Sequence, residues 1–103
     1  MEEWSEQQIK QRLEASDERL FIYFYTPMCG TCKVTERMLQ VVLAMEPNLP
    51  LVKCNANYCP GLTQSWKVES VPCIASIERR SLTRKRYRMQ GVADLLQWFQ
   101  ESA

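Results

Sequence analysis

Hydrophobic and polar positions follow one another in blocks that predict eight elements, in the order helix, strand, helix, strand, helix, strand, strand, helix. The clearest block is the continuous apolar and aromatic run 20–25. Such a run is typical of a strand buried on both faces of a covered sheet. In the segment 34–45 that follows, apolar residues recur at helical spacing and predict an amphipathic helix. Its apolar positions are Val34, Met38, Val41, Val42 and Met45.

Weaker patterns predict the other elements. They are a helix at 5–15, a strand at 51–55, a short helix within 57–67, strands at 71–77 and about 84–90, and a helix after Gly91. We expect Ser5 to cap the first helix and residues 79–83 to connect the last two strands as a hairpin. A strand–helix–strand unit followed by a hairpin and a helix predicts an α/β fold, with a central mixed four-stranded sheet flanked by helices. The length and the absence of repeats or linkers predict one domain, residues 1–103.

Two cysteines lie at the junction between the first predicted strand and the second predicted helix. Cys29 and Cys32 enclose Gly30 and Thr31, and Lys33 follows them. A helix N-terminus carries partial positive charge and unpaired N–H groups, so a thiolate there is stabilised and its pKa is lowered. Thiolates are the species that attack disulfides. The placement therefore predicts Cys29 as a nucleophile at the N-cap and Cys32, one turn inside, as the residue that resolves the mixed disulfide.

The Cys-x-x-Cys spacing is shared by redox sites and zinc sites. Zinc needs four ligands, but the chain has no histidine and no second closely spaced cysteine pair. At a strand-to-helix junction the motif favours redox chemistry. We expect no metal, and no cofactor beyond a redox-active Cys29–Cys32 disulfide. Metal binding by Cys29, Cys32 and Cys73 stays open as an alternative.

Composition and charge add mainly exclusions. Thirteen Lys and Arg balance twelve Asp and Glu, so the net charge of +1 indicates no particular partner. The first fifteen residues are acidic and polar, unlike a signal peptide, and no apolar run approaches the roughly 20 residues of a membrane span. We therefore expect a cytoplasmic protein without a membrane partner, whose cysteines are mostly reduced. The odd count of five cysteines leaves at least one unpaired in the monomer that we expect.

Four segments together resemble the thioredoxin family, and the resemblance covers nearly the whole chain. They are residues 24–33 with the cysteine motif, residues 52–55, residues 68–72 and Gly91. The resemblance implies a thioredoxin fold and a thiol–disulfide oxidoreductase. It also implies protein disulfides as substrates and a thioredoxin-reductase-type recycling partner. It further implies a cis peptide bond before Pro72, with the backbone of Val71 presented to an extended substrate strand.

One departure from the family pattern concerns the proton of the second cysteine. Tyr23 stands where many thioredoxins carry a buried Asp that is thought to take this proton. The phenol, with a pKa near 10, cannot do so near pH 7. We therefore expect resolution by Cys32 to be slower, or to use water or another base. Lys53 matches the family's lysine but has lost that buried Asp as its partner, because Tyr23 takes its place.

Residues around the motif are expected to bind the substrate. Met28 replaces the family's usual tryptophan and keeps an apolar, adaptable contact. Thr31 replaces the proline between the cysteines, restores one backbone N–H, and is expected to make the disulfide more oxidising. The expected substrate-binding set is Met28, Gly30, Thr31, Val71 and Pro72.

Three further cysteines and a basic run each admit a functional and a structural interpretation. Cys73 follows Pro72, and we favour a small buried side chain on a strand over a third thiol of the site. We expect Cys54 to be a small buried side chain and Cys59 a surface thiol, without a stable bridge. Residues 79–88 hold six of the thirteen basic residues. We favour a solvated hairpin over a patch that binds an acidic partner, and we expect no nucleic acid partner.

The sequence thus predicts a small thiol–disulfide oxidoreductase that exchanges disulfides with protein substrates. The alternative is a thioredoxin-fold binding or chaperone-like module. In that case the same groove holds partner chains and redox cycling is weak, as the missing buried acid at Tyr23 allows.

Overall fold

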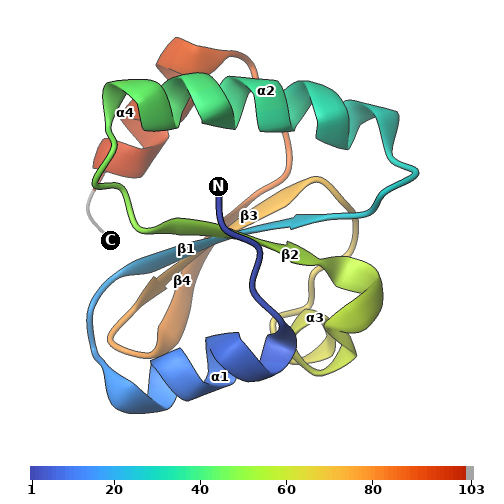
Figure 1. Cartoon of the computed structure of the whole chain (residues 1–103), viewed down its shortest axis with the longest axis vertical. Helices are drawn as coiled ribbons and strands as arrows, with labels where there is room; N and C mark the ends of the chain where they lie inside the picture. Colours follow the sequence, from blue (N-terminus) through green and yellow to red (C-terminus); the bar gives the residue numbers. More distant parts are fainter. Residues whose placement is uncertain (102–103) are drawn as a thin grey trace.

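A four-stranded sheet lies between two layers of helices in the computed structural model, which describes residues 1–101 (Figure 1). The elements are α1 (Glu6–Ala15), β1 (Leu20–Tyr25), α2 (Gly30–Met45), β2 (Leu51–Asn55), the 3-10 turn η1 (Ala56–Tyr58), α3 (Pro60–Ser65), β3 (Cys73–Glu78), β4 (Ser81–Arg86) and α4 (Val92–Gln100). The strand order is β2-β1-β3-β4, with β1 parallel to β2 and the other two pairs antiparallel. The mixed α/β architecture predicted from the sequence is confirmed.

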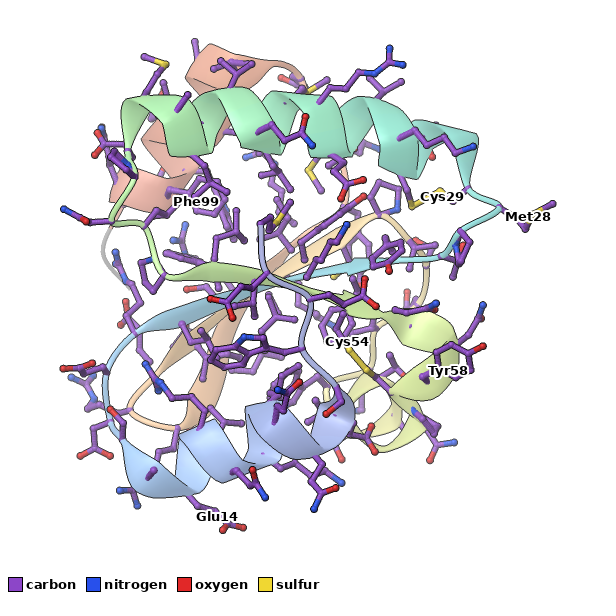
Figure 2. The ribbon with its side chains drawn as sticks, viewed as in Figure 1. Glu14, Met28, Cys29, Cys54, Tyr58 and Phe99 are labelled. Atoms are coloured by element: carbon purple, nitrogen blue, oxygen red, sulfur yellow. A yellow bond between two sulfur atoms is a disulfide. The ribbon has the colours of Figure 1, made fainter. Side chains whose placement is uncertain are left out.

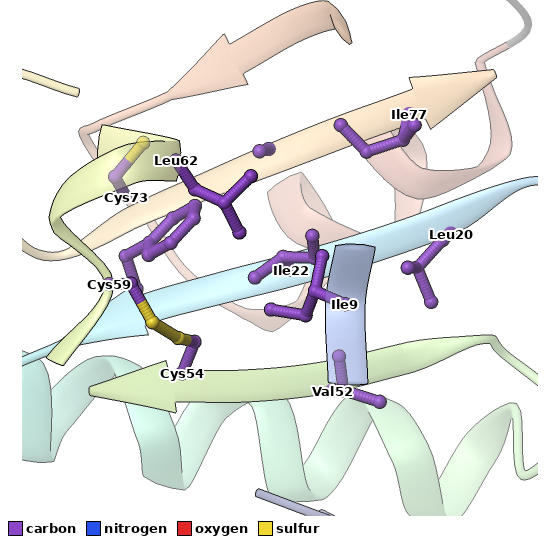
Figure 3. Packing of buried hydrophobic residues seen from close by; sticks show 11 residues of the cluster. Ile9, Leu20, Ile22, Val52, Cys54, Cys59, Leu62, Cys73 and Ile77 are labelled. Atoms are coloured by element: carbon purple, nitrogen blue, oxygen red, sulfur yellow. A yellow bond between two sulfur atoms is a disulfide. The ribbon is translucent and has the colours of Figure 1, made fainter. Parts of the chain in front are cut away.

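Strand β1 is central because both of its faces are apolar. Phe21 and Tyr23 point towards α2 and α4, whereas Ile22 and Phe24 point towards α1 and α3. All four of these side chains are fully buried. Figure 3 shows the second of these layers, where Ile9 of α1 packs over the sheet. The continuous apolar run therefore supplies core residues to both layers at once.

Helix α2 begins at Gly30, four residues before the apolar periodicity predicted. Its buried positions are Cys32, Thr35, Leu39 and Val42. The expected core residues Val34, Val41 and Met45 are 52%, 48% and 59% exposed, so the predicted buried face was wrong in part. Cys32 is the first buried residue of this helix, so the cysteine motif sets which face is buried. Val34 and Val41 then lie on the other side of the helix, towards the surface.

The hairpin between β3 and β4 is tighter than the sequence predicted. The turn contains only Arg79 and Arg80, and β4 starts at Ser81, so the predicted loop 79–83 and the strand at about 84–90 were wrong. Both arginines have positive φ, 50° and 69°. Two-residue hairpin turns of this kind usually carry Asn and Gly, so the arginines gave no turn signal.

The N-terminal residues add a short extension to the sheet. Trp4 N donates to Lys53 O at 2.9 Å, and Lys53 N donates to Glu2 O at 2.9 Å, so this segment lies along the outer edge of β2. Helix α1 then begins with the expected cap, since Ser5 and Gln8 form a reciprocal capping box.

Candidate active site

The Cys29–Cys32 pair sits where β1 passes into α2. A turn over 26–28 places Cys29 at the N-cap of α2, where its Sγ accepts a hydrogen bond from Cys32 N at 3.1 Å. The two cysteines form a disulfide, with their Cα atoms 5.2 Å apart. Cys32 is 2% exposed, whereas Cys29 is only half-buried and lies beside the protruding Met28 (Figure 2). Cys29 is therefore the sulfur that an incoming reactant can reach.

The segment before β3 lies against Cys29. The carbonyl oxygen of Val71 is 3.9 Å from Cys29 Sγ, and the peptide bond between Val71 and Pro72 is cis. This segment and the cysteine motif are 42 residues apart in the chain. The β1–β3 pairing, with Phe24 opposite Cys73, brings them together.

A groove of about 380 Å³ lies next to the cysteine motif, between the first turns of α2, Pro72 and residues 87–89 that follow β4. Thr31 and Pro72, both expected in the substrate-binding set, line it. The sequence analysis missed Arg88 and Met89, because it assigned them to a strand. It also treated Val34 as a core residue, although that side chain lines this groove. Met28 is 95% exposed at the same end of the molecule.

Gly30 presents open backbone between the cysteines. A Cβ atom placed on Gly30 would meet nothing within 4 Å. Thr31, the next residue, has its Oγ1 3.3 Å from Cys29 Sγ. The surface around Cys29 is therefore built from small or polar groups on one side and exposed apolar side chains on the other.

Beneath the first turn of α2, two neighbouring strand residues reach the helix. Tyr23 OH donates a hydrogen bond to Cys32 O at 2.7 Å, and Lys53 Nζ forms an ion pair with Glu36 Oε1 at 2.6 Å. Lys53 lacks the family's buried carboxylate at position 23, as expected, but it pairs with Glu36 instead. This partner comes from α2, one turn after Cys32, and no pattern in the sequence connected Glu36 with Lys53.

Tyr23 stays protonated in this environment. Burial raises the pKa of the Tyr23 hydroxyl well above its usual value, and the negative charge of Glu36 raises it further. The hydroxyl therefore acts as a hydrogen-bond donor to the backbone of Cys32. This agrees with the expectation that a tyrosine at this position cannot take up a proton near pH 7.

Two of the remaining cysteines form a second disulfide, between Cys54 and Cys59 (Figure 3). The expectations of a surface thiol at Cys59 and of no stable bridge were wrong. Cys59 is 1% exposed and Cys54 is fully buried. The turn η1 folds the chain back after β2, which brings the start of α3 over the end of the strand.

Cys73 is a buried free cysteine on β3, as the favoured interpretation predicted. Its side chain packs on the face of the sheet that α1 and α3 cover. Cys32, on α2, packs on the opposite face. Burial raises the pKa of the Cys73 thiol to about 11. Within residues 1–101, no three His, Cys, Asp or Glu side chains form a group that could hold a metal ion.

Several basic side chains of the β3–β4 hairpin contact neighbouring elements of the fold. Arg84 lies over the Trp98 ring, 4.5 Å from its centroid, and Arg86 pairs with Asp94. Lys85 Nζ donates to the carbonyl oxygens of Trp66 and Lys67. The favoured interpretation of a plainly solvated hairpin was therefore incomplete, because these cations anchor the hairpin to neighbouring elements.

Hydropathy adds one observation on the helices. None of those within residues 1–101 combines the length and the apolar character needed to cross a bilayer.

A mixed four-stranded sheet with a close cysteine pair between β1 and α2 supports assignment to the thiol–disulfide oxidoreductases of the thioredoxin fold. The thioredoxin family model matches residues 1–101. The thioredoxin-like protein YusE of Bacillus subtilis is 31% identical over 87 residues, which cover 84% of this chain and 82% of YusE. The chain therefore belongs to the thioredoxin family.

Other similar proteins agree on the fold. Mitochondrial thioredoxin-3 of Saccharomyces cerevisiae is 29% identical over 56 residues, which cover 54% of this chain and 44% of that protein. Its oxidised crystal structure superposes with a TM-score of 0.75 at 20% identity, over 96% of this chain and 92% of that one. Chloroplastic thioredoxin z gives a TM-score of 0.78 at 20% identity, over 96% of this chain and 90% of its own.

Proposed function

We propose that the protein exchanges disulfides with protein substrates through the Cys29–Cys32 pair. In reductive turnover, the Cys29 thiolate attacks a substrate disulfide and forms a mixed disulfide, and one substrate sulfur leaves as a thiolate. Cys32 then attacks Cys29, which forms the Cys29–Cys32 disulfide and releases the second substrate sulfur. The observation that carries this proposal is the half-buried Cys29 at the N-cap of α2, with Cys32 buried behind it.

The groove supports an extended protein segment as the substrate. Val71 O lies 3.9 Å from Cys29 Sγ, so a strand passing over the site finds a backbone acceptor beside the reactive sulfur. Exposed Met28 and Val34 offer apolar contacts on either side. Gly30 leaves room for the substrate backbone next to Cys29, because a Cβ atom there would meet nothing within 4 Å.

The proposed cycle also has consequences for cofactors, partners and location. The cycle needs no cofactor beyond the Cys29–Cys32 disulfide, and a thioredoxin-reductase-type enzyme would return that disulfide to the dithiol. A monomer suffices, because one chain supplies both cysteines and the groove. The cytoplasmic location stays a prediction.

Serine variants of the cysteines test the cycle. With a disulfide-bonded protein such as insulin and a thiol reductant, wild-type protein is expected to accelerate reduction, and Cys29→Ser to give only the background rate. Cys32→Ser is expected to accumulate a mixed disulfide through Cys29, detected by mass spectrometry. Cys73→Ser is the matched control and keeps the wild-type rate, because Cys73 lies in the opposite layer.

The same experiment separates the enzyme from the binding or chaperone-like alternative. The exposed apolar rim at Met28 and Val34 would hold an unfolded chain without any exchange. Binding that persists in Cys29→Ser, together with a wild-type rate no faster than background, would support the alternative and reject the oxidoreductase.

A further inference from the structure

The resolving cysteine is buried, so its proton needs a defined acceptor. Cys32 is 2% exposed, and its backbone carbonyl is held by Tyr23 OH. Only the thiolate form attacks a disulfide efficiently, so the Cys32 thiol must lose its proton in the resolving step. Bulk water reaches this sulfur poorly, and a neighbouring side chain is the alternative acceptor.

The ionisable groups beneath the first turn of α2 come from β1, β2, α2 itself and the N-terminal segment. From β1, the Tyr23 hydroxyl donates a hydrogen bond to the carbonyl of Cys32. The Tyr25 hydroxyl, whose pKa burial and Glu3 raise to about 12, donates a hydrogen bond to Glu3. From β2, Lys53 is the ion-pair partner of Glu36. From α2 itself comes Glu36. Glu3 lies on the N-terminal segment and accepts from Tyr25, whereas Glu36 lies on the same helix as Cys32, one turn further on, which favours Glu36 as the base.

The geometry brings Glu36 to the same side of α2 as the thiol. Glu36 lies four residues after Cys32, and side chains at this spacing have Cβ atoms about 5–6 Å apart. Helical side chains lean towards the N-terminus, so Glu36 leans towards the Cys32 turn. On the sheet below, Tyr23 and Lys53 are paired in register, and one holds Cys32 O while the other holds Glu36 Oε1.

Partial exposure suits Glu36 to a proton relay. The side chains of Glu36 and Lys53 are 26% and 24% exposed, respectively, so a proton taken inside the site can pass on to solvent. Lys53 uses one carboxylate oxygen, which leaves the other free to accept a proton. The charge of this carboxylate contributes to the raised pKa of Tyr23, so Glu36 lies close enough to act electrostatically on the buried end of the site.

We propose that Glu36 accepts the proton of the Cys32 thiol during resolution, while Lys53 holds the carboxylate and Tyr23 holds the Cys32 backbone. The inference rests on the function proposed above. In the step, the Cys32 S–H proton moves to Glu36 and the Cys32 sulfur attacks Cys29 Sγ. The Cys29–substrate S–S bond breaks and its electron pair leaves on the substrate thiolate. That thiolate takes its proton from solvent, and Glu36 then returns its own proton to solvent.

The test follows the two sulfur steps separately in a single turnover. Reduced protein is mixed with 5,5′-dithiobis(2-nitrobenzoate), which releases one coloured thiolate when Cys29 attacks and a second when Cys32 resolves. At pH 6, Glu36→Gln is expected to slow the second release by about 100-fold and to leave the first unchanged. The deficit is expected to shrink as pH rises, because hydroxide replaces the missing base. Glu46→Gln, exposed at the C-cap of the same helix, is the matched control and is expected to behave as wild type.

Two results would overturn the inference. One is a second release in Glu36→Gln with the wild-type rate and pH profile. The other is a Lys53→Met variant as slow as Glu36→Gln at every pH, because the lost ion pair alone would then explain the defect. We expect Lys53→Met, which keeps the carboxylate, to lose less than about tenfold. Failure of the wild-type protein to release either thiolate would instead reject the proposed function itself.

Discussion

Cys32 and Cys54 lie on opposite faces of the same sheet. Cys32, on α2, packs with Tyr23 on one face, whereas Cys54 lies beside Phe24 in the layer covered by α1 and α3. Figure 2 shows Cys29 on one side of the strands and Cys54 on the other. The backbone layer between them keeps the two disulfides apart, so each is expected to exchange independently of the other.

Stepwise reduction follows from this separation. With limiting dithiothreitol, the Cys29–Cys32 disulfide is expected to open first, because Cys29 is partly exposed whereas Cys54 and Cys59 are 0% and 1% exposed. Alkylation followed by mass spectrometry identifies the opened pair. Simultaneous opening of both pairs in the folded protein would contradict the expectation.

The Cys54–Cys59 bridge is expected to stabilise the fold. Its small loop predicts a contribution of about 2 kcal/mol from restricting the unfolded chain. Cys73→Ala measures the cost of removing one buried sulfur without a cross-link. The Cys54→Ala/Cys59→Ala double variant is expected to lose more than twice that cost, by about 2 kcal/mol, in urea unfolding. A loss no greater than twice the Cys73→Ala value would show that the bridge adds nothing.

Cys73 is expected to resist alkylation in the folded protein. Its pKa of about 11, raised by burial from the usual 9.0, leaves almost no thiolate at pH 8. The rate of modification by iodoacetamide should therefore rise up to about pH 11. The unfolded protein in urea is the control, in which Cys73 should titrate near 9.0. Rapid labelling of folded protein at pH 8 would show that the site opens.

Arginines of the hairpin are expected to differ sharply in their contribution to stability. Arg84 lies over Trp98 and donates to the carbonyl oxygens of Trp98 and Glu101, which ties β4 to the end of α4. Arg84→Ala is expected to cost about 1–2 kcal/mol. Arg80 pairs with Asp17 while 52% exposed, so Arg80→Ala is expected to cost less than about 0.5 kcal/mol. Urea unfolding of both variants checks this, and equal costs would contradict it.

The sequence predicted those features that are encoded locally. The run 20–25 had to be a central strand because both of its faces are apolar, and Cys29 and Cys32 stand at the junction that this strand creates. Ser5 and Gln8 cap α1 within one turn. Each of these signals is complete within a few neighbouring residues.

The features that were missed depend on contacts between distant segments. The partner of Lys53 is Glu36, 17 residues away on another element, and helical periodicity alone places such a residue in solvent. The Cys54–Cys59 bridge depends on η1 reversing the chain. The tight turn at Arg79 and Arg80 depends on β3 and β4 pairing strongly enough to hold two non-glycine residues at positive φ.

The short N-terminal pairing along β2 has a consequence for assembly. A free sheet edge presents unpaired N–H and C=O groups that recruit strands from other molecules. Glu2 and Trp4 already occupy the N–H and C=O of Lys53 on that edge, while the opposite edge strand, β4, carries Arg84, Lys85 and Arg86. The chain itself thus covers part of the β2 edge, while long basic side chains occupy the β4 edge. Removing residues 1–4 would expose the N–H and C=O of Lys53 on the first edge and is expected to favour edge-to-edge association.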